Sequence, residues 1–285
     1  ILAAAGMDHG AVFTATAVAS FIGTLCMALF ANYPFALAPG MGLNAYFAYT
    51  VVLGMGYSWE VALAAVLAEG IIFIILSCFN IREAIFNAIP FNLKKAVSVG
   101  IGLFITFLGL QNAKIVIGGA TLVGLFSVDG YNKTLADGLT ASMSDAGITV
   151  LLAIFGVLIT GILIVKNVKG NILWGILITW ILGIICQFAG IYIPNPDLGF
   201  YNLLPDFSNG ISIPSLAPIM FKFSLKGVPV LEFIVIVFAF LFVDLFDTLG
   251  TLIGVSAKAD MLDSEGRLPR IKGALLADAV GTTCG

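Results

Sequence analysis

The chain contains a long segment without any charged residue, from Gly10 to Trp59. The rest of the chain is similar in character: 60% of all residues are hydrophobic and 10% are charged, against about 25% charged residues in soluble domains. The mean hydropathy is +1.09. This composition predicts an all-α polytopic membrane protein. It gives no support to nucleic-acid binding, because the 13 Lys and Arg residues form no basic run.

Several apolar segments approach the length of about 20 residues with which a helix crosses the hydrocarbon core. A polar connector with a proline follows the third segment, and the long loops 118–146 and 194–228 separate later ones. We expect spans at residues 10–31, 44–53, 59–79, 96–117, 147–165, 172–193 and 230–255, and an eighth that begins near Ala274.

Positive residues in short loops mark the cytoplasmic side of a membrane protein. Here they follow the third span and lie between the fifth and sixth and between the seventh and eighth spans, so we expect these loops in the cytoplasm and the long loops outside. The residues counted are Arg82, Lys94, Lys95, Lys166, Lys169, Lys258, Arg267, Arg270 and Lys272.

The segment ANYPFALAPGMGLNAYFAYT, residues 31–50, places helix breakers inside the uncharged region. Pro34 and Pro39 lack N–H donors, while Gly40 and Gly42 allow the backbone to approach a ligand closely. Irregular backbone survives at membrane depth where it is buried in protein or lines a wet cavity, and transporters bind substrates at such broken helices. We therefore expect a binding site here, with Asn44 as a polar contact. An ordinary turn between two helices is the alternative.

The segment FLFVDLFDTLGTLIG, residues 240–254, carries two acids within an apolar stretch. Asp244 and Asp247 lie three residues apart, so they share one helical face. No Lys or Arg lies between residues 226 and 258, and ionisable residues inside a span are usually functional. Two carboxylates that repel each other favour binding of a proton, as a proton-coupled transporter requires. Alternatively, one acid caps a helix or pairs with a cation from elsewhere in the fold.

The other acids and the cysteines in the apolar segments carry weaker signals. Glu69 lies mid-span and is expected to pair structurally with another helix, and Glu232 suits the first turn of its helix. Gly250 and Gly254 have the spacing that allows close helix packing. The scattered cysteines form no metal-binding or redox pair and are expected to be small buried hydrophobes: Cys26, Cys78, Cys186 and Cys284.

Two segments resemble the azaguanine-type purine permeases, the hypoxanthine/guanine/adenine branch of the nucleobase–cation symporter-2 family. They are NYPFALAPGMGLNAYFAYTVV and FVDLFDTLGTLIGVSAKADMLDSEGRLPRIKGALLADAVGTT. The resemblance implies a 14-helix fold of two inverted seven-helix repeats with core and gate domains. The chain has no initiator Met and stops within an apolar stretch, so we expect a fragment that lacks both ends and holds helices two to nine.

On this resemblance, residues 1–95 form the first part of the core domain, with the broken helix at 32–53. Residues 96–228 form gate-domain helices and external loops, and residues 229–285 form the second part of the core. Asn44 matches the polar residue of the broken helix, and either Asp244 or Asp247 matches the carboxylate that binds the purine. A second acid of the family's site would lie beyond Gly285.

The resemblance also implies the activity: import of purine nucleobases across the cytoplasmic membrane by proton symport, without a cofactor or metal. The protein would be a multi-pass membrane protein whose partners are a purine, a proton or other cation, the lipid bilayer and a possible second copy in a homodimer. The expected substrate-binding residues are Asn44, Asp244, Asp247, Gly40, Gly42, Phe47 and Thr248, with Asp244 and Asp247 also coupling the proton. Tyr46 and Phe246 are further candidates for stacking on the ring.

Two other classes of protein, membrane enzymes and anion transporters, fit less well. An intramembrane prenyltransferase needs more acids in the motif, a second acidic motif and basic residues for a diphosphate, and an intramembrane aspartyl protease needs its two acids on separate helices. An anion transporter of the same fold would have few acids at its binding site. The order of preference among hypoxanthine, guanine, adenine and xanthine is left open.

Overall fold

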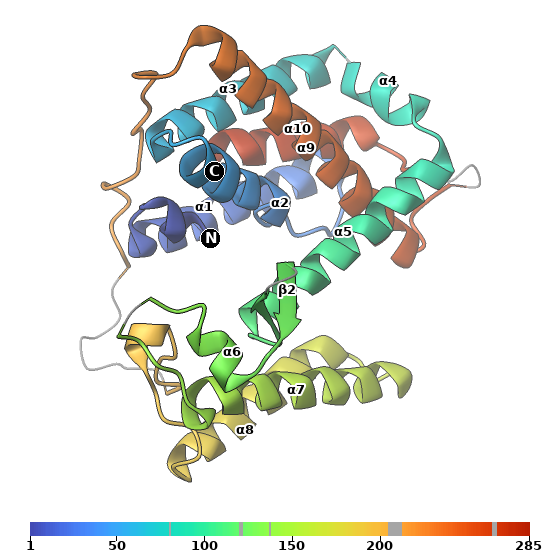
Figure 1. Cartoon of the computed structure of the whole chain (residues 1–285). Helices are drawn as coiled ribbons and strands as arrows, with labels where there is room; N and C mark the ends of the chain where they lie inside the picture. The colour runs from blue at the N-terminus through green and yellow to red at the C-terminus, as the bar shows by residue number, and fades with distance from the viewer. Residues whose placement is uncertain (80, 120–121, 137, 205–212, 264–266) are drawn as a thin grey trace. The chain divides into compact units, whose positions relative to one another are not determined.

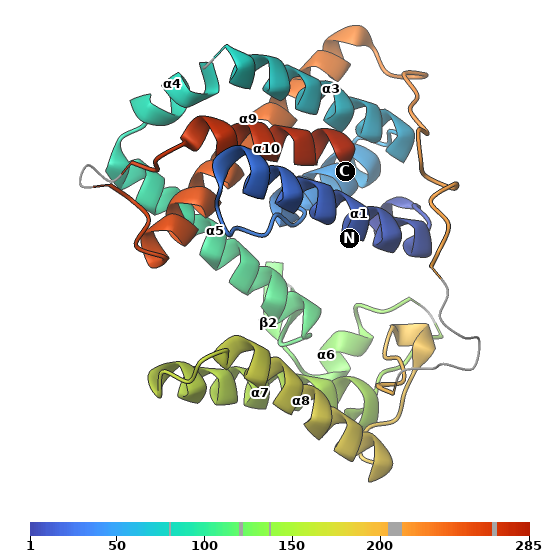
Figure 2. The ribbon, with the colours of Figure 1, turned by 180° about the vertical axis from the view of Figure 1, so that it is seen from behind.

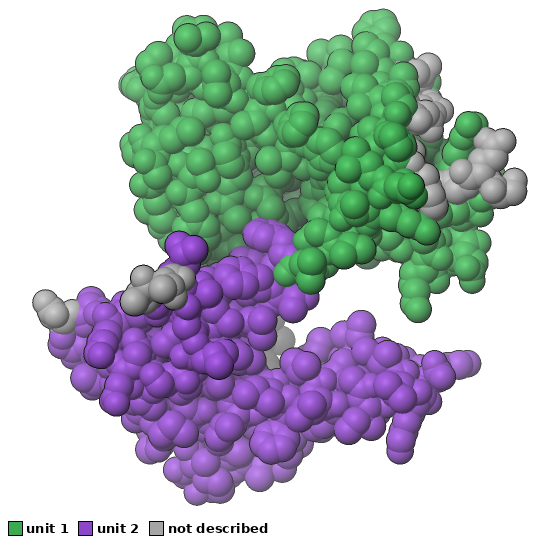
Figure 3. Space-filling view, turned by 45° about the vertical axis from the view of Figure 1, so that its right-hand side comes forward, with its two compact units in different colours: residues 1–103, 212–285 green, residues 104–211 purple. Residues whose placement is uncertain are grey.

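The computed structural model describes residues 1–79, 81–119, 122–136, 138–204, 213–263 and 267–285. The chain divides into two compact units, one made of residues 1–103 with 212–285 and the other of residues 104–211 (Figure 3). The first unit therefore joins the two ends of the chain, and it contains both segments that the sequence marks as functional.

Unit 1 is built from helices of very different lengths (Figure 1). Its elements are η1 (Leu2–Ala5), α1 (His9–Cys26), η2 (Met27–Ala31), α2 (Met41–Ala45), η3 (Tyr46–Gly54), α3 (Trp59–Cys78), α4 (Ile81–Ala88), the first part of α5 (Phe91–Asn112), α9 (Val230–Lys258) and α10 (Ile271–Cys284). Helix α10 lies between α3 and α1 (Figure 2), and α9 packs against α3 and α2.

Small residues allow α10 to lie this close to its neighbours. A Cβ atom added to Gly70 of α3 would come within 3.0 Å of the Thr283 backbone, and one added to Gly23 of α1 would lie 3.5 Å from the Gly281 Cα. Gly250 and Gly254 of α9 likewise meet α5, with Ser98 of α5 close to both. The prediction that these two glycines allow close helix packing is confirmed.

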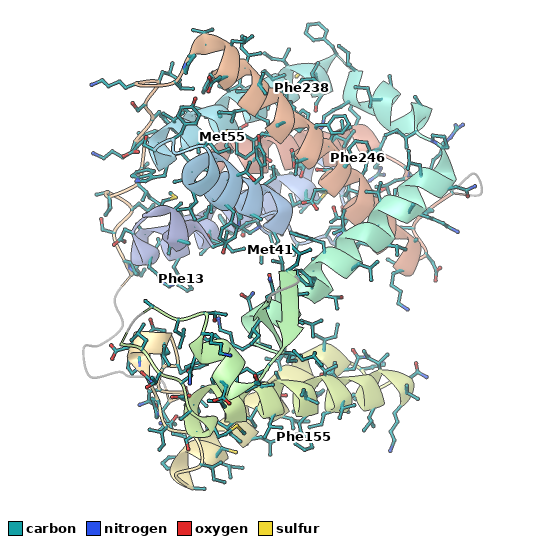
Figure 4. The ribbon with its side chains drawn as sticks, viewed as in Figure 1. Phe13, Met41, Met55, Phe155, Phe238 and Phe246 are labelled. Carbon is teal, nitrogen blue, oxygen red and sulfur yellow. The ribbon has the colours of Figure 1, made fainter. Side chains whose placement is uncertain are left out.

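The core of unit 1 has two apolar clusters. One surrounds Phe240 and Phe47, where α9 meets η3 and α3. The other joins η2, the Phe35 region, α9 and α10 around Leu249 and Ala274. Large apolar side chains also cover the outer faces, as the labelled Phe13 and Phe238 show (Figure 4). Such exposed apolar faces are what a bilayer-embedded helix requires.

Unit 2 contains the two-stranded antiparallel sheet of β1 (Val116–Gly119) and β2 (Leu122–Leu125), with Val116 opposite Leu125. Then come α6 (Val128–Asn132), η4 (Met143–Gly147), α7 (Ile148–Val165), α8 (Asn171–Phe188) and η5 (Pro196–Leu198). Helices α7 and α8 interlock reciprocally. A Cβ atom added to Gly156 would lie 2.5 Å from the Thr179 hydroxyl, and one added to Gly175 would lie 2.0 Å from the Thr160 hydroxyl.

Five helices of the described residues are long and apolar enough to cross a membrane: His9–Ala31, Trp59–Cys78, Lys95–Asn112, Met143–Val165 and Asn171–Phe188. They correspond to five of the predicted spans, and the mainly helical, multi-span fold is confirmed. Helix α9, which carries four charged residues, is not among the five.

Two local predictions were wrong. The connector after the third span folds into the helix α4, because its apolar residues recur at helical spacing. The fourth span ends at Asn112 rather than residue 117, since Lys114 adopts a left-handed conformation (φ 60°) and the chain turns into β1. The chain is thus mostly, and not entirely, α-helical. Residues 205–212 of the second long loop lie outside the described residues.

Candidate functional site

The break in the uncharged region lies at residues 32–40. The helical segment η2 stops where Asn32 adopts a left-handed conformation (φ 56°), and the chain then runs without regular structure to Gly40. The hydroxyl of Thr24 in α1 accepts a hydrogen bond from the Leu37 N–H at 2.9 Å and donates one to the Leu37 carbonyl at 3.5 Å. Irregular backbone leaves peptide N–H and C=O groups without the partners that a helix would give them. The Thr24 side chain of the neighbouring helix supplies such partners to both groups of Leu37.

After the break, α2 and η3 form a continuous helical segment, Met41 to Gly54. This is longer than the predicted span of residues 44–53, because the helix already starts directly after Gly40. The first N–H groups of a helix have no partner within the helix, so this segment presents free donors next to the break. The broken-helix prediction for this region agrees with the backbone described here.

Asp247 of α9 faces this break. A Cβ atom added to Gly40 would lie 2.8 Å from the Asp247 Oδ2 atom, so only a glycine lets the carboxylate come this close to the start of α2. The side chain is half-buried, and Asp247 and Gly40 come from segments about 200 residues apart in the chain. The structure thus brings together one acid of α9 and the irregular segment, as the sequence predicts.

Asp244 has different surroundings, although it lies on the same helix. It is 3% exposed and lies in a cluster with Glu69 of α3, Arg82 of α4 and Asp278 of α10. The Arg82 Nη2 atom is 3.8 Å from Asp244 Oδ2 and 2.7 Å from Asp278 Oδ2. For Asp244 the structure therefore has the alternative left open by the sequence, a cation that comes from elsewhere in the fold.

Arg82 is the centre of this cluster and is itself 1% exposed. Its Nη1 atom donates a hydrogen bond to the Leu275 carbonyl at 2.8 Å, and its guanidinium lies 3.7 Å from the centre of the Phe73 ring. The sequence interpretation placed Arg82 in a cytoplasmic loop. This was wrong, because pairing with Asp278 and stacking on an aromatic ring hold the charge inside the protein.

Thr248 connects the two aspartates of the cluster. Its hydroxyl lies 2.9 Å from Asp278 Oδ2 and 3.4 Å from Asp244 Oδ1, so it can donate to either carboxylate. Asp278 is a functional candidate that the sequence interpretation missed. A single Asp in the apolar segment GALLADAVGTT was the available signal, since ionisable residues in such segments are rare.

The other predicted site residues lie on the α2–η3 segment or beside it. Asn44 is half-buried, and its backbone N–H donates to the Gly40 carbonyl at 3.0 Å. A Cβ atom added to Gly42 would lie 3.8 Å from the Val243 Cγ1 atom, which is an ordinary van der Waals distance. Phe47 is enclosed in the apolar cluster around Phe240. The predicted contacts of all these side chains with a ligand stay predictions.

The remaining aromatic and acidic residues considered from the sequence have partners within the fold. Tyr46 packs edge-on against Phe240, with ring centres 4.9 Å apart, and Phe246 packs edge-on against Phe242 at 4.8 Å. Glu232 accepts a hydrogen bond from the Tyr57 hydroxyl, and this bond raises the pKa of the Tyr57 phenol.

The sequence is similar to known permeases along its whole length. The model of the Permease family matches residues 1–285. Identity is 47% over the whole chain to a provisionally named permease of Methanocaldococcus jannaschii and 42%, over 98% of the chain, to the guanine/hypoxanthine permease PbuG of Bacillus subtilis. It is 35% over the whole chain to the adenine permease AdeP of Escherichia coli. The chain spans 58%, 57% and 57% of these relatives. The resemblance noted in the sequence is confirmed.

Proposed function

Since the chain belongs to the Permease family, we propose that the protein is a secondary active transporter that imports purine nucleobases by proton symport. The observation that carries this proposal is the approach of Asp247 to the broken segment at Gly40. Membership of this family indicates that the chain is part of a transporter and not an enzyme. Together with the long apolar helices, it also indicates a multi-pass protein of the cell membrane. The membrane enzymes considered from the sequence are thereby excluded.

The site chemistry suits a flat heteroaromatic ring with polar edges. The Asp247 carboxylate offers acceptors for ring N–H groups, and the Asn44 amide offers both donors and an acceptor. Peptide N–H groups at Gly40 and Gly42 offer further donors to ring nitrogen or carbonyl oxygen. We assign the purine contact to Asp247 rather than Asp244, because Asp244 is enclosed by the Arg82 cluster. Thr248 then positions Asp244 and Asp278.

Relatives support the class of substrate. Two that match more than nine tenths of the chain are named guanine/hypoxanthine and adenine permeases. We further propose the 14-helix inverted-repeat fold, with unit 1 in the core domain and unit 2 in the gate domain. Unit 1 contains both the broken segment and the buried acids, and this supports its assignment to the core domain. A homodimer stays part of the proposal.

Uptake of radiolabelled hypoxanthine, guanine and adenine by cells that express the full-length protein tests the function. Asp247→Asn should abolish uptake, because an amide N–H would face the ring N–H that needs an acceptor. The matched control is Asp197→Asn, which changes an exposed acid in unit 2 and should transport as the wild type does.

Two results would contradict the proposal at different levels. A wild type that takes up none of these purines above the level of control cells refutes purine transport. Unchanged apparent affinity in Asp247→Asn, with wild-type uptake, refutes the assignment of the site and leaves the transport activity standing.

A further inference from the structure

Glu69 is the most completely buried acid of the described residues, and the proposed function leaves it without a role. It lies in the middle of α3 with 0% exposure. Its carboxyl group lies within hydrogen-bonding reach of the Asp244 carboxyl group. Apart from each other's carboxyl group, neither oxygen of Glu69 nor Oδ2 of Asp244 has a hydrogen-bond partner among the described residues. Unpaired buried polar atoms are costly, so this contact requires a physical explanation.

The local charges do not balance. Arg82 supplies one positive charge, and its short ion pair at 2.7 Å is with Asp278. Glu69 and Asp244 remain as two acids in mutual contact. Two adjacent carboxylates shielded from water cannot both stay ionised, and such a pair holds one proton between them. The missing hydrogen-bond partner is then the proton itself.

The neighbouring groups bind the pair without fixing the proton on one of its two acids. Arg82 and the Thr248 hydroxyl both approach Asp244, at 3.8 and 3.4 Å. Both lie closer to Asp278, at 2.7 and 2.9 Å, so the proton belongs to the Glu69–Asp244 pair as a unit, and the carboxyl group that holds it donates its O–H to the other.

Among the side chains that the structure describes, the elements packed against α3 bring few other groups that titrate. Asp244 comes from α9, Arg82 from α4 and Asp278 from α10, and the α10 segment next to Gly70 contributes the neutral Thr283. η3 has no charged residue and contributes Tyr46, whose ring packs against Phe240. The pair is thus the exchangeable part of the cluster, while Arg82 and Asp278 neutralise each other.

We propose that the Glu69–Asp244 carboxyl pair is the proton-binding site of this transporter and that Asp247 contacts the purine. This inference rests on the proposed function. A proton from water binds a carboxylate oxygen of the pair and later leaves to water on the other side, with no other bond formed or broken. Because Asp244 and Asp247 are three residues apart on α9, loading of the pair acts on the helix that also carries the purine contact.

The test uses the full-length protein in proteoliposomes with Glu69→Gln. With one proton per purine, a membrane potential of about 100 mV drives roughly 50-fold accumulation in the wild type. Glu69→Gln should lose this accumulation, so that the ratio of internal to external purine falls to about one. Exchange of internal unlabelled for external labelled purine, which needs no net proton movement, should continue. Initial exchange rates should also become independent of pH.

Two further variants keep the result interpretable. Glu60→Gln, in the first turn of the same helix, is the matched control and should accumulate purine as the wild type does. Glu69→Asp keeps a carboxyl group and should restore accumulation in part, while changing the pH of half-maximal uptake. A helix that merely needed a polar residue at this position would be satisfied by Gln.

The outcomes separate the two proposals. If Glu69→Gln accumulates purine as the wild type does, driven by the membrane potential and dependent on pH, the proposed proton site is wrong. The same holds if Glu69→Asp behaves like Glu69→Gln, or if neither variant exchanges purine, since the acid is then structural. A wild type that exchanges no purine at all instead refutes the proposed function. Wild-type accumulation that ignores a protonophore refutes proton coupling but leaves purine transport in place.

Discussion

Replacing Arg82 by Met tests whether the buried cluster is held together by this cation. Met retains apolar volume beside Phe73, so the change removes charge and hydrogen bonds without opening a large cavity. It leaves the Leu275 carbonyl without its donor and Asp278 without its ion pair at 2.7 Å. Breaking a buried pair by removing one partner costs about 3 to 5 kcal/mol. Since Arg82 is 1% exposed, we apply this range without a reduction for solvent screening.

The assay is the thermal unfolding midpoint of the purified full-length protein in detergent. A loss of this size lowers the midpoint by roughly 10 °C in a chain of a few hundred residues. Combining Arg82→Met with Asp278→Asn should recover about 2 kcal/mol, because the second change removes the charge left unpaired. The matched control is Arg270→Met at an exposed position, which should change stability by less than about 0.5 kcal/mol.

Additive effects of Arg82→Met and Asp278→Asn would refute this reasoning. The ion pair would then contribute nothing specific to the fold, and the cluster would not be neutralised in the way that the proton-site argument assumes.

Two further predictions concern the broken segment. Gly40→Ala should reduce purine uptake at least tenfold, while Gly42→Ala should reduce it less, because the new Cβ lies 2.8 Å from a carboxylate oxygen in the first case and 3.8 Å from an apolar side chain in the second. Initial uptake rates, corrected for the amount of protein in the membrane, measure this, and equal losses at both positions would contradict it. Asn44→Ala should weaken apparent affinity or change the preferred purine while expression persists. Competition by unlabelled purines measures this, and unchanged inhibition constants would exclude Asn44 from the site.

The sequence allows the main features of the broken segment to be predicted. Pro34, Pro39 and two glycines inside an uncharged region predict irregular backbone, and the structure has it at residues 32–40. The bounds differ because helix formation restarts directly at Met41 once the last proline and Gly40 are passed. Local residue preferences carry this information, so a local pattern is enough to reveal it.

The environment of Asp244 could not be predicted in the same way. Its cation, Arg82, lies in a segment with the appearance of a polar connector, and its neighbours Glu69 and Asp278 come from two further helices. The pairing of these charges depends on which helices pack together. The spacing of residues within one segment does not show which helices pack together. The two acids of α9 therefore have separate surroundings although they share a helical face.

The mid-helix position of Glu69 has an electrical consequence. Glu69 lies ten residues after the start of the 20-residue helix α3, and at 1.5 Å per residue this is about 15 Å from either end. A proton that reaches it from outside has crossed roughly half of a hydrocarbon core of about 30 Å. Loading the proposed site thus moves charge through part of the membrane field. Proton entry should produce a transient current in the absence of purine, and its midpoint voltage should move with external pH.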